Sequence, residues 1–475
     1  MSTYRNGASN DYVCNAMNTD LSQVDLSFPK EFEKRMIETL GADDWSAFAK
    51  EHLNSPPVSI RINPQKQFTD TGTPIPWCKA GRYLKERPVF TLDPCFHAGA
   101  YYVQEASSMF LEQAFRQIVG LDEPLTVLDL SAAPGGKSTH ILSLISGSSL
   151  VISNEVIRSR ANILSENIQK WGYPNCIVTN SDPTDFTKLQ GFFDVIVVDA
   201  PCSGEGLFRK DRNAMAEWSI ENVNLCSARQ QRILQDVWPA LKENGILIYS
   251  TCTYNAQENE DNLNRFSKEH DLAFVPLQLD PRWGVLTVEK NDVVGYRFMP
   301  HHVSGEGFFF SIMRKKQKTD VIQTRIKNKL TPASKKSVEK LSSWITQPDA
   351  YTFFQHQDLI FTLPTLQQKN IETIISTLCF VYGGTNIATV KHDKYIPEHA
   401  LALSTIINKG YFNTEAIDHV TAIKYLRRDV INLPDSPVGY TLLTYEGCSL
   451  GWANVLANRV NNLYPQEWRI RMQAN

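Results

Sequence analysis

Short apolar runs alternate with segments of helical periodicity in the middle of this 475-residue chain, and this alternation limits the fold more than any other feature. Continuous apolar runs separated by helical segments are typical of βαβ units, whose strands are buried on both faces. The sequence therefore predicts an α/β fold with a doubly wound parallel sheet, in which the loops after the strands gather at one edge. The predicted strands are residues 126–130, 150–153, 176–179, 194–199 and 245–249, and the predicted helices are residues 137–145, 159–171 and about 220–241.

Two cysteines follow directly on predicted strands. Cys202 ends an Asp-Ala-Pro-Cys segment that begins at Asp199, and Cys252 lies fifty residues later in a Ser-Thr-Cys-Thr segment. Open α/β sheets bind ligands at the carboxyl ends of their strands, whereas a cysteine that only packs lies more often inside an apolar run. Two thiols at this edge predict covalent catalysis in which they divide the work. For either cysteine, a buried structural thiol is the alternative.

The loop after the first predicted strand contains small residues and a lysine: Ser131, Ala132, Ala133, Pro134, Gly135, Gly136 and Lys137. Its Gly-Lys-Ser end matches the tail of a phosphate-binding P-loop, but that motif requires glycine at position 131. The dinucleotide fingerprint Gly-x-Gly-x-x-Gly is also absent. The remaining interpretation is a nucleoside-type cofactor that lies across the start of the next helix, where glycines allow the backbone to approach it closely.

Acidic residues follow the second and third predicted strands. Glu155, twenty residues beyond Gly135, is placed to accept hydrogen bonds from ribose hydroxyls. Asp182 is expected to reach the base. Either carboxylate can instead cap a helix or lie in a solvated loop. Together with the glycine loop, these acids favour S-adenosyl-L-methionine as the cofactor.

With these segments in place, the sequence resembles the Sun/Fmu family of RNA cytosine-5 methyltransferases. Four motifs occur in the order of that family, at residues 131–137, 199–202, 251–253 and 258–260. The resemblance extends to residues 57–64, 102–105 and 305–309. Residues 451–470 are similar to the PUA-like RNA-binding tail of the bacterial branch that modifies small-subunit ribosomal RNA, whereas residues 314–392 match no motif.

The resemblance implies that Cys252 attacks carbon 6 of cytosine and that Cys202 assists release of the adduct. Carbon 5 is a poor nucleophile until a thiolate adds to carbon 6. Spacing alone does not separate the two roles, because the Pro-Cys cysteine attacks in the DNA enzymes. Asp199 is expected to supply a proton toward ring nitrogen 3, or else to cap the turn before Pro201. Lys137 is expected to orient Asp199 or the cysteines, because a merely solvated lysine in a first helical turn would oppose the helix dipole. Both residues are also expected among the cofactor-binding residues.

The implied catalytic fold is a Rossmann-like S-adenosylmethionine-dependent sheet between a small N-terminal domain and a C-terminal RNA-binding domain. The expected boundaries are a loose N-terminus at residues 1–24, an RRM-like or mixed α/β domain at 25–120, the catalytic domain at 121–314, a basic segment and intermediate subdomain at 315–400, and a PUA-like domain at 401–475.

Two segments carry the charge and aromatic pattern expected for RNA contact. Residues 314–340 contain ten lysines or arginines against Asp320 and Glu339, which favours phosphate contact, although a solvated linker would have the same composition. The C-terminal segment interleaves basic and aromatic residues, which suits stacking on unpaired bases unless the aromatic rings form a core. These residues are Arg459, Arg469, Arg471, Trp452, Tyr464 and Trp468.

Charge, hydrophobic stretches and cysteine spacing exclude several classes of protein. The net charge is −3, and no apolar stretch has a length suited to spanning a bilayer or to a signal peptide. None of the nine cysteines forms a Cys-x-x-Cys pair, so we expect reduced thiols and no metal site. From these features we expect a cytoplasmic protein with no membrane partner. The resemblance implies a monomer whose partner is RNA and not DNA, most specifically 16S rRNA, either as naked RNA or within a small ribosomal subunit. The alternatives are a tRNA cytosine-5 methyltransferase and a non-catalytic RNA-binding factor for ribosome assembly.

Overall fold

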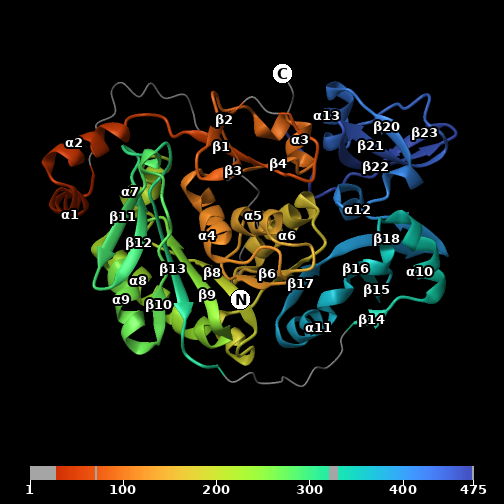
Figure 1. Ribbon diagram of the computed structural model, residues 1–475. Coiled ribbons are helices and arrows are strands. Elements are labelled where there is room, and N and C mark those ends of the chain that lie inside the picture. The colour runs from red at the N-terminus through yellow and green to blue at the C-terminus, as the bar shows by residue number, and fades with distance from the viewer. Residues whose placement is uncertain (1–27, 70–71, 320–329, 473–475) are drawn as a thin grey trace, which may run out of the picture.

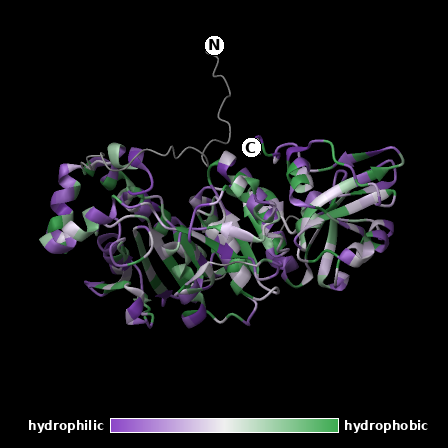
Figure 2. Ribbon diagram, turned by 90° about the horizontal axis from the view of Figure 1, so that it is seen from above, coloured by the Kyte–Doolittle hydropathy of each residue, from purple (hydrophilic) through white to green (hydrophobic). Residues whose placement is uncertain are grey.

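The computed structural model describes residues 28–69, 72–319 and 330–472. The N-terminus expected to be loose lies outside the described residues, as do residues 320–329 of the basic segment. Figure 1 shows a central sheet, a helical pair at one end of the molecule and two smaller sheets at the other end. Figure 2 shows that hydrophobic residues concentrate in the strands, whereas hydrophilic residues are more frequent on peripheral helices and loops.

The central sheet has ten strands, and its middle is parallel as the sequence predicts. Nine strands run in the order β11-β12-β13-β9-β8-β5-β6-β7-β17, and β10 pairs with β13. The parallel strands are β5 (Thr126–Asp129), β6 (Leu150–Asn154), β7 (Cys176–Thr179), β8 (Phe193–Asp199) and β9 (Leu241–Thr251). The predicted parallel strands are confirmed, and both edges carry further strands that the sequence did not predict and that are antiparallel. These are β10 (Leu272–Phe274), β11 (Leu286–Lys290), β12 (Val293–Phe298), β13 (Phe308–Lys315) and β17 (Phe380–Gly383).

Helices cover both faces of the central sheet. Alternate residues of a strand point to opposite faces, so Val127 packs into one hydrophobic cluster and Leu128 into another. Helices α4 (Leu111–Ile118), α5 (Gly136–Leu144) and α6 (Arg158–Trp171) contribute to the first cluster. Helices α8 (Ile220–Val237), α9 (Glu260–Glu269) and α11 (Gln368–Thr377) contribute to the second. The predicted helices therefore exist, and α8 ends earlier than expected because β9 already begins at Leu241.

The N-terminal region consists of a helical pair and a four-stranded antiparallel sheet. The sheet has the order β2-β3-β1-β4, formed by β1 (Val58–Ile62), β2 (Thr73–Ile75), β3 (Cys78–Leu84) and β4 (Tyr101–Val103), with the short helix α3 (Pro94–His97) before β4. Helices α1 (Lys30–Leu40) and α2 (Ala42–Glu51) pack through Phe32 and Phe48 against Phe208 and Trp218 near α7 (Arg212–Glu217). The helical pair therefore rests on the segment that follows β8.

The C-terminal part contains two further sheets. The intermediate sheet runs β14-β15-β16-β18-β19, and the last sheet runs β20-β21-β22-β23. Their elements are β14 (Thr331–Pro332), α10 (Lys335–Leu341), β15 (Tyr351–His356), β16 (Leu359–Pro364), β18 (Thr385–Lys391), β19 (Lys394–Pro397), α12 (His399–Leu403), β20 (Asn413–Ala416), α13 (His419–Arg427), β21 (Gly439–Tyr445), β22 (Cys448–Leu456) and β23 (Arg459–Asn462). Because β17 pairs with β7, the intermediate region is tied into the central sheet.

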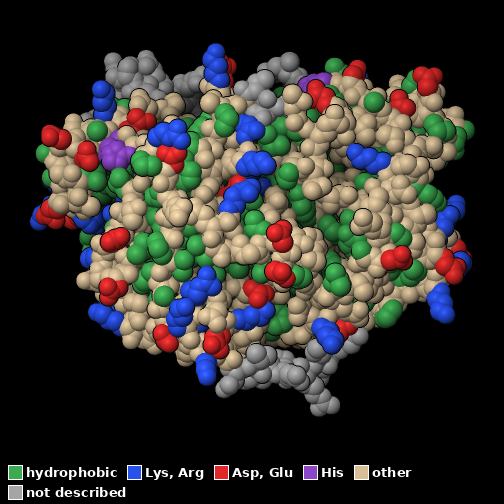
Figure 3. Space-filling model, viewed as in Figure 1, with side chains coloured by type: hydrophobic (Ala, Val, Ile, Leu, Met, Phe, Trp, Pro, Cys, Tyr) green, Lys and Arg blue, Asp and Glu red, His purple; other side chains and the backbone are tan. Residues whose placement is uncertain are grey.

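The structure corrects three of the residues expected to contact RNA. Lys315 is buried, and its Nζ donates to the backbone oxygens of Trp238 and Leu241, both at 2.9 Å. Trp452 and Tyr464 are buried in the core, so their rings are not available for stacking on bases. On the face shown in Figure 3, basic and acidic side chains are interspersed and form no single basic stripe. No helix among the described residues is long and apolar enough to cross a membrane.

Candidate active site

The two cysteines that follow β8 and β9 lie in contact. Their Sγ atoms are 3.0 Å apart, and the backbone N–H of Cys252 donates to Sγ of Cys202 at 3.3 Å. This proximity follows from the sheet, because β8 and β9 are parallel neighbours and Asp199 is paired with Ser250. The hydrogen bond with Cys252 and burial raise the pKa of the Cys202 thiol. Cys202 is therefore a protonated thiol beside Cys252.

A buried carboxylate holds the two cysteine loops together. Glu258 accepts hydrogen bonds from the backbone N–H of Ser203 at 3.0 Å, from the Ser203 hydroxyl, from Asn255 Nδ2 at 2.6 Å and from Gln230 Nε2 at 2.9 Å. The Ser203 hydroxyl also lies 3.1 Å from that of Thr253. The residues that follow the two cysteines, Ser203 and Thr253, are thus held by one network, which fixes the positions of both loops.

Lys137 and Asp199 form an ion pair at the carboxyl end of β8. Nζ of Lys137 lies 2.7 Å from Oδ2 of Asp199, while the Ser250 hydroxyl donates to Oδ1 at 2.7 Å. Nζ of Lys137 also lies 5.2 Å from the ring centroid of Phe308. The lysine comes from the first turn of α5, so the ion pair joins the glycine loop to the Asp-Ala-Pro-Cys segment. Asp199 remains partly exposed and can also meet a ligand.

A cavity of about 330 Å³ connects these elements. It lies where the glycine loop, the end of β8, the Cys252 loop, the N-terminal sheet and the segment before β13 meet. Of the residues expected to bind the cofactor or catalyse, those lining the cavity are Ser131, Ala132, Ala133, Pro134, Gly136, Lys137, Asp199 and Cys252. The remaining lining residues are Tyr102, Val103, Gln104, Glu105, Ser108, Leu207, Glu306, Gly307 and Phe308. Cys202 is outside this lining but contacts Cys252.

The two acids expected to hold the cofactor do not line the cavity. Glu155 is buried; its carboxylate accepts from the backbone N–H of Ile157 at 3.0 Å and lies 3.3 Å from a guanidinium nitrogen of Arg160. Asp182 caps the short helix η4 (Pro183–Lys188) by accepting from the backbone N–H of Thr184 at 3.1 Å. Asp182 therefore makes the capping contact that the sequence left open as the alternative, whereas Glu155 makes local contacts without capping α6. Gly135 also lies outside the lining.

The N-terminal sheet contributes site residues to which the sequence alone assigned no role. Arg61 is completely buried, donates from Nε to Gln104 at 2.8 Å and from Nη2 to the Thr139 hydroxyl at 2.6 Å, and lies 4.5 Å from the ring centroid of Trp171. It joins Gln104 at the cavity to α5 behind the glycine loop. Residues 57–64 and 102–105 resemble family motifs, but the motifs do not reveal that the strands β1 and β4 lie against the glycine loop, which is distant in the sequence.

Glu205 is a second positioning residue that sequence reasoning missed. Its buried carboxylate pairs with Arg35 of α1 and accepts from the backbone N–H of Tyr254 at 3.1 Å and from Trp218 Nε1 at 3.0 Å. It thus joins the helical pair to both cysteine loops. Its place immediately after the Cys-Ser-Gly sequence is the one local signal for this role.

Comparisons with known proteins cover most of the chain. Residues 117–314 match the model of 16S rRNA methyltransferase RsmB/F, residues 28–106 match the N-terminal domain of 16S rRNA methyltransferase RsmF, and residues 412–470 match the methyltransferase RsmF PUA domain. The chain belongs to the RsmB/F methyltransferase family. It is therefore an S-adenosylmethionine-dependent RNA methyltransferase, with an N-terminal domain and a C-terminal PUA domain beside a Rossmann-like sheet.

Full-length relatives and solved structures agree with this assignment. Ribosomal RNA small subunit methyltransferase F of Enterobacter sp. (strain 638) is 29% identical over 479 residues, which cover 94% of this chain and 97% of the relative. The protein of the same name from Shewanella loihica is 28% identical over 475 residues, with 94% and 95% covered. A methyltransferase homologue from Pyrococcus horikoshii has a TM-score of 0.51 at 26% identity, covering 61% of this chain and 95% of that one. NSun6 from the same organism has a TM-score of 0.52 at 19% identity over 61% and 99%, which supports the fold.

The cavity fits the family's cofactor. Gly135 has φ of +117°, a conformation that favours glycine, and this turn brings the chain into α5. Gly136 and Lys137 open α5 and line the cavity, so a helix N-terminus borders it. An N-terminus of this kind, together with a lysine, suits the carboxylate of the methionine moiety. Bound S-adenosylmethionine would supply the methyl group here.

Proposed function

We propose that the chain transfers a methyl group to carbon 5 of a cytosine in RNA, and that this RNA is 16S rRNA of the small subunit. The observation that carries the chemistry is the pair of thiols 3.0 Å apart, one of which lines the cavity with the Lys137–Asp199 ion pair. The substrate class is supported by relatives named ribosomal RNA small subunit methyltransferase F. We also propose that the chain acts as a cytoplasmic monomer, on RNA alone or within an assembling small subunit.

Cys252 is proposed as the nucleophile. Its sulfur forms a bond with carbon 6, and the electron pair of the ring double bond moves toward nitrogen 3. Lys137 gives a proton to Asp199 along their 2.7 Å contact, and Asp199 passes a proton to nitrogen 3, where it neutralises the developing charge. Carbon 5 becomes enamine-like and accepts the methyl group. The buried network around Glu258 preserves the orientation of the Cys252 loop throughout.

Cys202 is proposed to assist release. The last step breaks the bond between carbon 6 and Cys252, and the proton on carbon 5 leaves to the Cys202 thiolate that forms once Cys202 has given its own proton to the Cys252 sulfur. Because its pKa is raised, Cys202 carries a proton, and it lies in contact with the departing sulfur. Donation of its S–H to that sulfur would make Cys252 a better leaving group. Glu155 is proposed to accept hydrogen bonds from the ribose hydroxyls of the cofactor, and Asp182 is proposed to reach its base.

Release of tritium from carbon 5 tests the function directly. RNA labelled at cytosine carbon 5 is incubated with the protein and S-adenosylmethionine, using 16S rRNA, small subunits and tRNA in parallel. We expect cofactor-dependent tritium release from 16S rRNA or small subunits. Release from tRNA alone would favour the tRNA alternative, and no release despite RNA binding would favour a non-catalytic assembly factor. Bisulfite mapping of rRNA from a deletion strain identifies the nucleotide.

A further inference from the structure

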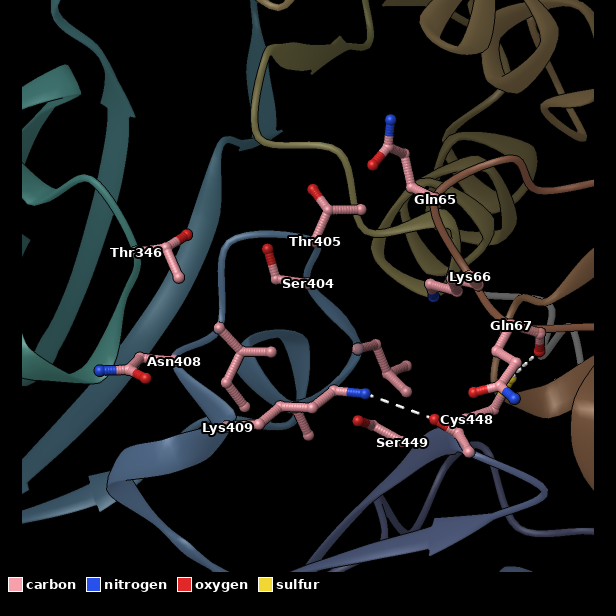
Figure 4. Close-up of a pocket in the computed structure, with 14 residues that line it drawn as sticks. Gln65, Lys66, Gln67, Thr346, Ser404, Thr405, Asn408, Lys409, Cys448 and Ser449 are labelled. Atoms are coloured by element: carbon pink, nitrogen blue, oxygen red, sulfur yellow. Dashed lines mark hydrogen bonds between the residues drawn. The ribbon is translucent and has the colours of Figure 1, made fainter.

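A second cavity, of about 340 Å³, lies where four segments from separate regions of the chain meet. These segments are residues 65–67 after β1, Thr346 before β15, residues 402–405 and 407–409 at and beyond the end of α12, and residues 447–449 at the turn between β21 and β22 (Figure 4). It shares no lining residue with the cavity at Cys252. The cavity therefore exists only because the N-terminal, intermediate and PUA regions pack together.

The lining of this junction cavity has the chemistry of a phosphate and sugar site. Among its fourteen lining residues are Lys66 and Lys409, several hydroxyl and amide side chains, no carboxylate and no aromatic ring. Its volume is within the usual range for a bound small group, about 300 to 1,000 Å³. Without an aromatic ring it offers no stacking surface for a base. Cations with hydroxyl and amide groups are instead typical of contacts to phosphate and ribose.

One hydroxyl in this lining lacks a partner. Ser449 is 9% exposed, and its Oγ has no hydrogen-bond partner in the structure. Leaving a buried hydroxyl unpaired is unfavourable unless a ligand or water completes it. Lys409 extends toward the same turn, where Nζ meets the backbone oxygen of Gly447 at a long 3.4 Å (Figure 4). Lys409 is thus placed to donate to an anion in the cavity, and the buried Ser449 hydroxyl can join it when its side chain rotates toward the cavity.

Lys66 lines the opposite side of the junction cavity. Its Nζ donates to the backbone oxygens of Ala98 at 2.6 Å and Lys170 at 2.5 Å. Burial lowers the pKa of this ammonium group to about 7, so an anion nearby would stabilise its charged form. Lys66 fixes the segment 65–67 to α6, and its positive charge is favoured when an anion occupies the cavity.

We propose that the junction cavity binds a phosphodiester unit of the substrate RNA, with Lys409 and the Ser449 hydroxyl as donors to the phosphate oxygens. The proposal rests on the proposed function, since it assumes that the substrate is RNA. A phosphate held between the N-terminal sheet, the intermediate sheet and the PUA domain sets the register of the strand without reading its sequence. Its position relative to Cys252 then helps to determine which nucleotide reaches the active site.

Lys409→Ala and Ser449→Ala test the proposal, with Lys268→Ala on the exposed face of α9 as a control of equal charge change. The probe is a short single-stranded RNA of 16S sequence. Lys409→Ala is expected to raise the Kd about tenfold and to reduce the slope of log Kd against log salt by about 0.7. Ser449→Ala is expected to raise the Kd severalfold at an unchanged melting temperature, because its Oγ has no partner in the free protein. Lys268→Ala should change neither.

Measurements of methyl transfer distinguish an error in the phosphate-site proposal from an error in the proposed function. Both variants should raise the KM for RNA and leave kcat at saturating RNA unchanged. If the wild-type protein binds and methylates RNA and the two variants do so equally well, the junction cavity is not a phosphate site although the function stands. If Ser449→Ala lowers the melting temperature and leaves RNA affinity intact, the hydroxyl is structural and the proposal is wrong. If the wild-type protein neither binds nor methylates RNA, the proposed function itself fails.

Discussion

The two cavities differ little in volume, about 330 and 340 Å³, but they are built in opposite ways. The catalytic cavity gathers loops at the carboxyl edge of one sheet, and most of its wall comes from local sequence motifs. The junction cavity is assembled from four short segments that no motif connects. Chemistry that needs fixed distances between reacting groups is thus placed on one rigid sheet, whereas contact with an extended polymer is distributed over packed domains.

The largest expected effect concerns the two thiols of the catalytic cavity. If Cys252 attacks carbon 6, Cys252→Ala should lose at least about 1,000-fold in turnover and form no covalent complex. Cys202→Ala should still attack but stall before release, so that a protein–RNA adduct accumulates. Denaturing gel electrophoresis with substrate RNA and cofactor distinguishes the variants. A stable adduct from Cys252→Ala and none from Cys202→Ala would reverse the assignment.

The next largest expected effect is on the pH dependence of stability, and it comes from a buried acid behind the glycine loop. Asp129 at the end of β5 is fully buried, and the Ser138 hydroxyl donates to it at 2.6 Å. Burial raises the pKa of this carboxyl from 3.8 to about 7. The folded state therefore binds a proton that the unfolded state releases, so this contribution to stability is present below about pH 4 and is lost as pH rises toward 7. The loss is about 3 kcal/mol over that interval.

Asp129→Asn removes this titration and isolates the contribution. The difference in unfolding free energy between the variant and the wild type should shift in favour of the variant as pH rises from 4 to 7, as measured by urea denaturation. The difference is needed because buried histidines give the opposite slope: burial lowers the pKa of His97 to about 3 and that of His140 to about 4. A difference that does not vary with pH would mean that Asp129 is ionised in the folded protein.

Glu155 tests whether an acid outside the cavity lining still supports the cofactor. Glu155→Ala is expected to weaken S-adenosylmethionine binding by about 1.5 to 3 kcal/mol, the scale of hydrogen bonds to a charged group. Glu155→Gln is the matched control, since it removes the charge and keeps an oxygen that can accept from Ile157 and from ribose. Arg160→Ala would also release the Ala133 backbone oxygen in the cavity wall. Calorimetry that finds equal affinity in Glu155→Ala and wild type would confine Glu155 to its local contacts.

The sequence predicted best those structural features that short stretches of the chain determine. The five parallel strands and the contact between Cys202 and Cys252 follow from apolar runs and the geometry of parallel sheets, both of which are encoded over short stretches. The antiparallel edge strands and the insertion of β17 beside β7 were not foreseen, because pairing between distant strands leaves no periodic signal in either one. The same limit hid Arg61 and Glu205, whose partners lie far away in the sequence.

Charge and aromatic content were the weakest predictors of which residues are available to contact RNA. Lys315 belongs to a run of basic residues yet lies buried against the backbone of Trp238 and Leu241. Trp452 and Tyr464 belong to the hydrophobic core and offer no stacking surface. The sheet of a small domain must bury one of its faces, and these rings help to cover it. Composition does not distinguish a residue that faces solvent from its buried neighbour. The junction cavity has no compositional signal at all.

The smallest expected effect concerns the exposed remainder of the basic segment. Lys316 and Lys318 are exposed, whereas Lys315 is buried and should be left intact to preserve the fold. If both lysines contact phosphate, Lys316→Ala with Lys318→Ala should flatten the dependence of log Kd on log salt by about 0.7 per contact. Fluorescence anisotropy across a salt series measures this slope, with Lys268→Ala as the matched control. An unchanged slope would identify this stretch as a solvated linker and leave the junction cavity as the stronger candidate for phosphate contact, because every lysine that contacts a phosphate releases counterions and must appear in the slope.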